Sequence, residues 1–577
     1  PGCIGLSGNG AITTHASQGD GATGSARHRW VCRWTATQQP VRGSTGTPAP
    51  APAPATQAQP TSAGDAVRFL EQSTFGVTEA AIDEVKTKGP ALVIEEQFAK
   101  PPSGYPAMTV ADPDQPKQCP DGSPPTCVRD NYTAFPLQRV FFQNAVGGAD
   151  QLRQRVAFAL SQIFVVSMSV VDRTYAMRNY QQILFDNAFG NFKDILTEIT
   201  LSPVMGRYLD MVNNQKADPA KGIKPNENYA RELLQLFSIG LYLLNPDGTR
   251  QLDAQGNPIP SYEQDAIDNF ARVFTGFTYP TRPGQTAKFP NPDHFDGKMI
   301  AFPAFHDTGT KTLLNNATLP AGQTPEKDVA DAIDNVFRHP NVGPYIGKQL
   351  IQFLVTSNPS AMYVARVTSA FNDNGQGVRG DLKAVIRAVL RDVEARGDTK
   401  LDAFVGKLRE PVLYMTSLVR GLNGTSDGVY LQAAADGMGQ PPFLSPSVFN
   451  FYPPTYEVPG TDLLGPQFKI FQTSTILNRA NFVNDLLFSK NENVAAAKDV
   501  AGASGTMTNA NAFSAVAGDA AALIDRLSVI LVSSGLSAAD KQTIVTAVNA
   551  VPANDAVKRV RTAAYLLVTS AQGQVTR

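Results

Sequence analysis

From Asp65 onward, hydrophobic residues recur at the three- and four-residue spacing of amphipathic helices, and alternating strand-like patterns are almost absent. The pattern predicts helices over residues 65–72, 79–99, 134–146, 149–168, 174–189, 191–213, 226–243, 262–276, 326–338, 340–356, 359–372, 380–392, 403–421, 427–436, 473–488, 517–533, 538–548 and 554–570. Two starts carry a polar cap before a proline, Thr324 with Pro325 and Asn358 with Pro359. We therefore expect an all-α body.

Three long segments between the helices show no helical pattern: residues 100–133, 277–325 and 438–472. They are rich in proline, glycine and aromatic residues. Loops of this length inside a domain are usually either functional or disordered, and the aromatic content favours order. We expect the segments 277–325 and 438–472 to form the mouth of a polar cleft.

The start of the chain differs in composition from the rest. Residues 1–46 are dominated by Gly, Thr, Ser and Ala, and residues 47–64, "TPAPAPAPATQAQPTSAG", suit an extended spacer. We predict an N-terminal extension over 1–46 and a Pro/Ala-rich linker over 47–64. A large helical domain should follow over 65–490, and a C-terminal helical subdomain over 491–577 should pack on it.

Charge and hydropathy exclude two classes of partner. The 577 residues include 50 Lys and Arg and 51 Asp and Glu, which gives a net charge of −1. A balanced chain has no general attraction to nucleic acid or to an anionic membrane. The longest apolar run, residues 156–171, is interrupted by Ser161 and Gln162 and is short for a membrane span. We expect no nucleic-acid partner and no transmembrane segment.

The four cysteines form two local pairs, Cys3 with Cys32 and Cys119 with Cys127. The second pair flanks "CPDGSPPTC", whose Asp, Gly and two prolines are typical of a turn. Its spacing is not that of a zinc knuckle. We predict a Cys119–Cys127 disulfide and, with it, an oxidising compartment.

An ordered set of motifs runs through the helical body and includes "DAVRFLEQSTFGVTEAAIDEV", "NENYARELLQLFSIGL", "FTGF", "FHDTGTKTLL" and "MGQPPFLSPSVFNFY". The set resembles the bacterial domain-of-unknown-function family 1800 (DUF1800) over about residues 65–490. The resemblance implies a largely helical, secreted or periplasmic protein. It also implies a partner, because members are often encoded beside a second family that looks like the sulfatase and phosphatase superfamily. It supplies no catalytic residues.

Candidate chemistry is concentrated in "NPDHFDGKMIAFPAFHDTGTK", which holds Asp293, His294, Asp296, His306 and Asp307. Two imidazoles and three carboxylates within such a short stretch suit a borderline-hard divalent metal or a general acid–base pair. The alternative is structural, because a histidine before a turn often caps a backbone carbonyl, and Asp-Thr-Gly is good turn chemistry.

His339, which opens the helix after "FRHPNV", could supply a further nitrogen ligand. We predict a metal site with His306, Asp307, His294 and His339 as ligands. The residue types favour a divalent transition metal, whose identity stays open. A structural role at a helix junction is the competing interpretation of His339.

The stretch "NENYARELLQLFSIG", residues 226–240, has an unusual polar arc of amides and paired charges beside its apolar face. Asn226 is the expected helix N-cap. The arc could fix a long loop to the body or line a pocket. Glu232 against a basic partner would be structural, whereas Glu232 facing His306 would form a metal or proton-relay site.

These observations lead to two functional hypotheses. The first is an exported enzyme, a metal-dependent hydrolase or oxidase acting on an extracytoplasmic substrate in a loop-lined polar cleft. Its catalytic residues would be His306 and Asp307, with Glu232 and Arg231 nearby. Arg231 would bind a negatively charged part of the substrate. The alternative is a non-catalytic secreted or envelope scaffold or binding protein that works with a sulfatase-like partner.

Overall fold

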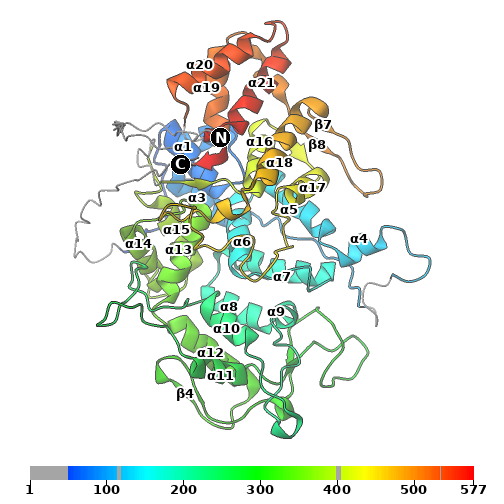
Figure 1. Cartoon of the computed structure of the whole chain (residues 1–577), viewed down its shortest axis with the longest axis vertical. Coiled ribbons are helices and arrows are strands. Elements are labelled where there is room, and N and C mark those ends of the chain that lie inside the picture. The colour runs from blue at the N-terminus through cyan, green and yellow to red at the C-terminus, as the bar shows by residue number, and fades with distance from the viewer. Residues whose placement is uncertain (1–49, 113–118, 398–404, 533–534) are drawn as a thin grey trace, which may run out of the picture. The chain divides into compact units, whose positions relative to one another are not determined.

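Helices make up most of the chain in the computed structural model, which describes residues 50–577 except 113–118, 398–404 and 533–534. The strands in this part form only two- and three-stranded sheets. The predicted all-α fold is therefore confirmed for the described residues (Figure 1). The predicted extension over 1–46 lies outside them.

The α-helices within these residues are α1 (Ala63–Ser73), α2 (Glu79–Lys88), α3 (Pro90–Ala99), α4 (Cys127–Tyr132), α5 (Phe135–Gly147), α6 (Gln151–Ile163), α7 (Thr174–Asp186), α8 (Phe192–Leu201), α9 (Pro203–Tyr208), α10 (Asn228–Gln235), α11 (Gln264–Val273), α12 (Pro325–Arg338), α13 (Val342–Leu354), α14 (Ala361–Asn372), α15 (Leu382–Arg391), α16 (Pro411–Gly421), α17 (Val429–Gly437), α18 (Thr473–Asn484), α19 (Ala520–Leu531), α20 (Ala538–Asn549) and α21 (Ala556–Thr569).

The strands are short and antiparallel, and some of the pairs join distant parts of the chain. The pairs are β1 (Phe277–Thr278) with β2 (Ile300–Ala301), β3 (Lys311–Thr312) with β4 (Thr318–Leu319), β5 (Lys407–Leu408) with β9 (Val575–Thr576), and β8 (Thr506–Met507) with both β6 (Thr425–Ser426) and β7 (Asn493–Val494). The β5–β9 pair places residues 575 and 576 beside residues 407 and 408. Their contact is reinforced by the backbone N–H of Arg409, which donates to the carbonyl of Gln574 at 2.7 Å.

Two of the long predicted helices are each broken in two by a proline. The helix expected over 79–99 stops before Gly89, whose φ of +80° favours glycine, and restarts at Pro90. The helix expected over 191–213 breaks before Pro203. A proline has no backbone donor and disfavours helical geometry in the residue before it, so it ends one helix and begins the next.

Side-chain caps set several other boundaries. Thr324 caps α12 as predicted, because its hydroxyl accepts the backbone N–H of Lys327 at 3.3 Å. The cap predicted at Asn358 is wrong: α14 begins later, and the hydroxyl of Ser360 accepts the N–H of Tyr363 at 3.1 Å. Both caps satisfy a backbone donor that the first helical turn leaves unpaired.

The helix predicted over 226–243 is shorter than its apolar pattern. It spans Asn228–Gln235, and Asn226 lies outside it, where its side chain accepts the N–H of Asn228 at 2.9 Å. The chain leaves the helix before Gly240, which has a φ of +73°. A Cβ at Gly240 would lie only 2.7 Å from the ring of Tyr345, so the close packing there requires glycine.

One hydrophobic core extends from the first helices to the last. It includes Phe75, Leu160, Leu350, Leu527 and Leu567, all of them almost completely buried. Figure 1 shows α19, α20 and α21 packed beside one another, and α19 also contacts α16. The helices after residue 490 therefore share the core of those before it. Among the described helices, none combines the length and apolar character that crossing a bilayer requires.

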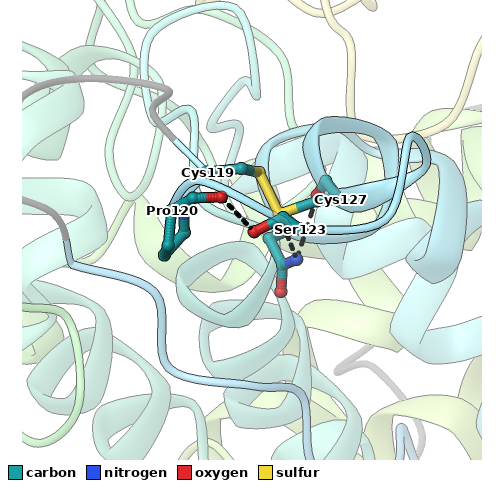
Figure 2. Close-up of a disulfide and its surroundings, with 5 residues drawn as sticks. Cys119, Pro120, Ser123 and Cys127 are labelled. Carbon is teal, nitrogen blue, oxygen red and sulfur yellow. Dashed lines mark hydrogen bonds between the residues drawn. A yellow bond between two sulfur atoms is a disulfide. The ribbon is translucent and has the colours of Figure 1, made fainter.

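The predicted Cys119–Cys127 disulfide is confirmed, with the two Cα atoms 6.2 Å apart. Figure 2 shows the loop that it closes, in which the hydroxyl of Ser123 donates to the carbonyl of Pro120 at 2.6 Å. The loop leads into α4, a helix that the hydrophobic pattern of the 100–133 segment did not predict. Cys3 and Cys32 lie outside the described residues.

Candidate functional site

His306 lies in a fully buried position between the end of α11 and the start of α12. Its Nδ1 is 2.9 Å from the carbonyl oxygen of Thr275, and its Nε2 is 3.0 Å from Oδ2 of Asp328. The side chain has no exposed surface. Each ring nitrogen therefore lies within hydrogen-bond distance of an oxygen atom. These contacts account for both polar atoms of the ring.

Lys311 completes a buried charge network with this histidine. Its Nζ lies 2.7 Å from Oδ2 of Asp328 and donates to the carbonyls of Asp307, at 2.5 Å, and Gly309, at 3.1 Å. Burial alone would raise the pKa of Asp328, but hydrogen bonds from His306 and Lys311 hold it below its ordinary value. The buried carboxylate of Asp328 is therefore stabilised by hydrogen bonds from both neighbours.

Asp307, beside His306, is held by an arginine on α11. Nε and Nη2 of Arg272 each lie 3.0 Å from a carboxylate oxygen of Asp307, and the N–H of Gly309 donates to Oδ1 at 2.9 Å. Desolvation would raise the pKa of Asp307, yet these hydrogen bonds lower it. A bidentate pair of this kind fixes the turn after His306 to α11.

The glycine of the "FTGF" motif, Gly276, allows the backbone around His306 to pack closely against it. Gly276 has a φ of +86°, and a Cβ there would lie 2.9 Å from the backbone nitrogen of His306 and 3.0 Å from the carbonyl of Phe302. Only glycine adopts this conformation without strain while leaving room for a second backbone. The motif therefore serves backbone packing.

His339 ends α12 and is 2% exposed. Its Nδ1 accepts the backbone N–H of Asn341 at 3.2 Å. Burial, and to a smaller degree the charge of Arg379, lower the pKa of His339 to about 4. The ring is therefore neutral near pH 7 and acts as a hydrogen-bond acceptor at a helix junction.

Arg231 and Glu232 point to different surroundings from α10. Arg231 pairs on the surface, with Nη2 2.7 Å from Glu227 and 3.4 Å from the side-chain oxygen of Gln264. Glu232 is half-buried, and its Oε2 has no hydrogen-bond partner among the described residues. Desolvation raises the pKa of Glu232, and the charge of Arg231 partly offsets this.

The predicted site residues do not form one cluster through direct contacts. In the described part of the chain, no hydrogen bond or ion pair joins His306 or Asp307 to Arg231 or Glu232, and α11 contacts both α10 and α12. The described residues also contain no group of three or more His, Cys, Asp or Glu side chains arranged to hold a metal. The catalytic and metal roles of these residues stay predictions.

A different arrangement surrounds His294. Its Nδ1 forms a hydrogen bond with Oδ2 of Asp112, and the other oxygen of Asp112 accepts the hydroxyl of Tyr175 on α7. The Tyr175 hydroxyl in turn accepts the backbone N–H of Phe295 at 3.0 Å. His294 is 5% exposed. Asp112 and His294 belong to two of the three long segments, which therefore meet at this pair.

The hydrogen bonds fix the roles of both groups. Because the oxygen of Tyr175 already accepts the N–H of Phe295, its own proton points to Asp112. Asp112 therefore accepts hydrogen bonds through both oxygens, and Nδ1 of His294 carries a proton. No described residue hydrogen-bonds to Nε2 of His294. An aspartate that orients an imidazole in this way leaves Nε2 as the basic nitrogen.

A cation lies near this pair. Arg207 is exposed on α9, and its pKa is raised first by the nearby Tyr279 and also by Asp293, the residue before His294. The ring of Tyr279 packs against Phe295 with 5.3 Å between centroids. Arg282 also donates to the carbonyl of Asp293, at 2.8 Å from Nη2. The environment of the pair thus combines a base, aromatic surface and positively charged side chains.

The family model described as "Protein of unknown function (DUF1800)" matches residues 68–575. The chain belongs to this family. The match runs past residue 490, where the resemblance of the motifs ended, and so takes in the C-terminal helices of this DUF1800 chain. No curated protein and no solved structure matches it.

In this DUF1800 protein, sequence reasoning singled out His294 but missed Asp112. The two residues are 182 positions apart, and Asp112 lies in a segment without hydrophobic periodicity. Asp328 was missed for another reason, because an acid in the first turn of an amphipathic helix is usually a solvated partner of the helix dipole. The only available signal for Asp112 was its place in a long segment rich in aromatic and turn residues.

Proposed function

We propose that the protein is an extracytoplasmic hydrolase in which His294, oriented by Asp112, acts as a general base. The observation that carries the proposal is the hydrogen-bond chain from Phe295 through Tyr175 and Asp112 to Nδ1 of His294. It gives the imidazole one defined tautomer, with Nε2 available to accept a proton. A general base can activate water for hydrolysis, a reaction that needs no electron acceptor.

The proposed reaction is hydrolysis of an ester. Nε2 of His294 takes a proton from water as the water oxygen attacks the carbonyl carbon. The same proton then passes from His294 to the leaving alkoxide as the carbon–oxygen bond breaks, which yields an acid and an alcohol. Asp112 stabilises the imidazolium that forms between the two steps. The exposed charge of Arg207 would attract an anionic part of the substrate.

The location outside the cytoplasm is supported by the Cys119–Cys127 disulfide, because structural disulfides persist in oxidising compartments. The proposal therefore includes secretion or a periplasmic location. It does not require a metal at His306, since both ring nitrogens there have oxygen partners. The proposed mechanism uses side chains alone, and the metal-dependent mechanism stays a prediction.

The proposal is tested by ester hydrolysis with 4-nitrophenyl acetate and butyrate. We expect His294→Gln to lower kcat/KM by about 10²–10⁴, the usual contribution of a positioned general base. Asp112→Asn should lower it by a smaller factor, because the ring is retained but misoriented. Lys298→Ala is a matched control in the same segment, where the lysine pairs with Glu198 on the surface. Wild-type rates in His294→Gln would contradict the proposal, as would a folded wild-type protein that hydrolyses neither ester.

The alternative is a non-catalytic envelope protein that works with a sulfatase-like partner. One observation favours a binding role: the groove between α17 and α18 has the volume of a small-molecule site. It is tested by mixing the purified protein with a sulfatase-like protein of the kind often encoded beside members of the family. A stable complex on size-exclusion chromatography, together with no ester hydrolysis, would favour this alternative.

A further inference from the structure

An open groove between α17 and α18 has the size of a small-molecule site. Its volume is about 450 Å³, within the range of roughly 300–1,000 Å³ that ligand pockets span. Tyr430, Ala433 and Gly437 line it from α17. Helical spacing places these three residues on one side of α17, and the two small ones leave the space beside the tyrosine open.

Asparagine side chains form the opposite wall. Asn478, Asn481 and Asn484 recur at every third position of α18, and all three line the groove. The amide of Asn478 donates to the carbonyl of Gly437, whereas no described residue hydrogen-bonds to the side chain of Asn481. Each asparagine amide offers two donor hydrogens and an acceptor oxygen. The wall can therefore pair with hydroxyl groups in either direction.

An aromatic pair adds an apolar surface to the amides. The rings of Tyr430 and Phe482 are stacked, with centroids 5.6 Å apart and planes 20° apart. Phe482 is buried, while Tyr430 is partly exposed. The hydroxyl of Tyr430 donates to Oδ2 of Asp485 at 3.0 Å, which fixes the ring orientation. A fixed, partly exposed ring suits the C–H face of a sugar.

The end of α18 is widened into a π-helix over Asp485–Ser489. The N–H of Lys490 donates to the carbonyl of Asp485 at 2.7 Å, the five-residue spacing of such a turn. The wider turn brings the hydroxyl of Ser489 to the groove. Single π-turns of this kind often occur at functional sites.

The charges that line the groove indicate which class of ligand it can bind. No Lys or Arg lines the groove, and Asp485 is its one carboxylate. The single charged residue of α18, Arg479, is buried, so the exposed face of the helix has no charge and leaves Leu477 59% exposed. A plain solvent face of a helix would carry Lys and Glu. The uncharged face disfavours phosphate-bearing ligands and favours neutral ones.

We infer that the groove between α17 and α18 is a binding site for a neutral carbohydrate. The sugar hydroxyls would pair with Asn481, Asn484 and Ser489, and one ring face would lie on Tyr430. This site shares no residue with the Asp112–His294 pair. The inference therefore stands or falls separately from the proposed hydrolase activity.

The test is saturation-transfer NMR and calorimetry on the full chain with cellobiose, maltotriose and N,N′-diacetylchitobiose. At least one should bind, with the strongest transfer at ring C–H protons. Ala433→Leu should abolish binding, because the larger side chain fills the groove from an exposed position. Asn481→Ala should raise Kd at least tenfold.

Gln542→Ala is the matched control, since it removes an exposed amide from a different helix, α20. It should leave Kd unchanged, and circular dichroism should show all three variants folded. The inference is overturned if none of the three sugars binds, or if Ala433→Leu and Asn481→Ala bind as the wild type does. Tighter binding of an anionic probe, glucuronate, than of every neutral sugar would overturn the assignment of ligand class.

Discussion

Replacing Lys311 by Met tests whether the charge network around His306 is a structural element. Both Lys311 and Asp328 have side chains that are 1% exposed. Removing one partner of a buried ion pair leaves the other charge without compensation, which costs about 3–5 kcal/mol. In Lys311→Met, Asp328 keeps only the contact with His306, and two carbonyls lose their donor. We expect the free energy of unfolding to fall by about 3–5 kcal/mol.

Two comparisons make this magnitude informative. Arg231→Ala removes a surface pair whose side chains are 39% and 41% exposed, and such pairs contribute about 0.3–0.5 kcal/mol. The double variant Lys311→Met with Asp328→Leu removes both buried charges. It should cost less than the sum of its two single variants, because neither charge is left uncompensated.

The assay is urea unfolding followed by far-UV circular dichroism, together with hydrogen exchange of the α12 amides. Exchange reports the free energy of local opening where the network lies. The structural interpretation is refuted if Lys311→Met changes the unfolding free energy by less than about 1 kcal/mol, or if the double variant shows the sum of the single effects. In either case the charges around His306 would be free for another role.

Three further predictions concern other parts of the chain. The pKa of His339 is lowered from 6.5 to about 4. Between these pH values the imidazole is protonated in the unfolded chain but neutral in the folded chain. Stability should therefore fall as pH drops from 6.5 towards 4, and urea midpoints of His339→Gln should lack this component. The thiols of Cys119 and Cys127 should resist maleimide until a reductant is added, and Cys119→Ser should lower stability by roughly 2–3 kcal/mol; rapid labelling without reductant would contradict the disulfide. Gly276→Ala should lower the thermal midpoint because of its φ of +86° and the 2.9 Å approach of the His306 nitrogen; an unchanged midpoint would count against that account.

The helical character of the body could be predicted from the sequence because apolar spacing depends only on local geometry. The helix boundaries were harder to predict from the sequence. The breaks at Gly89 and before Pro203 follow from the properties of proline. They were not predicted because the helical spacing of apolar residues continues across both positions. The short α4 was missed because six residues are too few to establish a period.

The candidate sites depended on contacts that no local pattern contains. His306 was singled out as a candidate catalytic residue and metal ligand, but its partner Asp328 lies on a different element. The hydrogen bond of His294 to Asp112 joins two aperiodic segments. Such pairings are decided by the tertiary fold, so residue types could suggest the histidines but could not choose their partners.

The pairing of β5 with β9 has a consequence for biosynthesis. Lys407 and Leu408 find their strand partners only at Thr576 and Val575, and Arg409 its backbone acceptor at Gln574. The pair can therefore form only after translation has passed Thr576, 169 residues beyond Lys407. Until then Lys407 and Leu408 lack the strand that pairs with them in the folded protein.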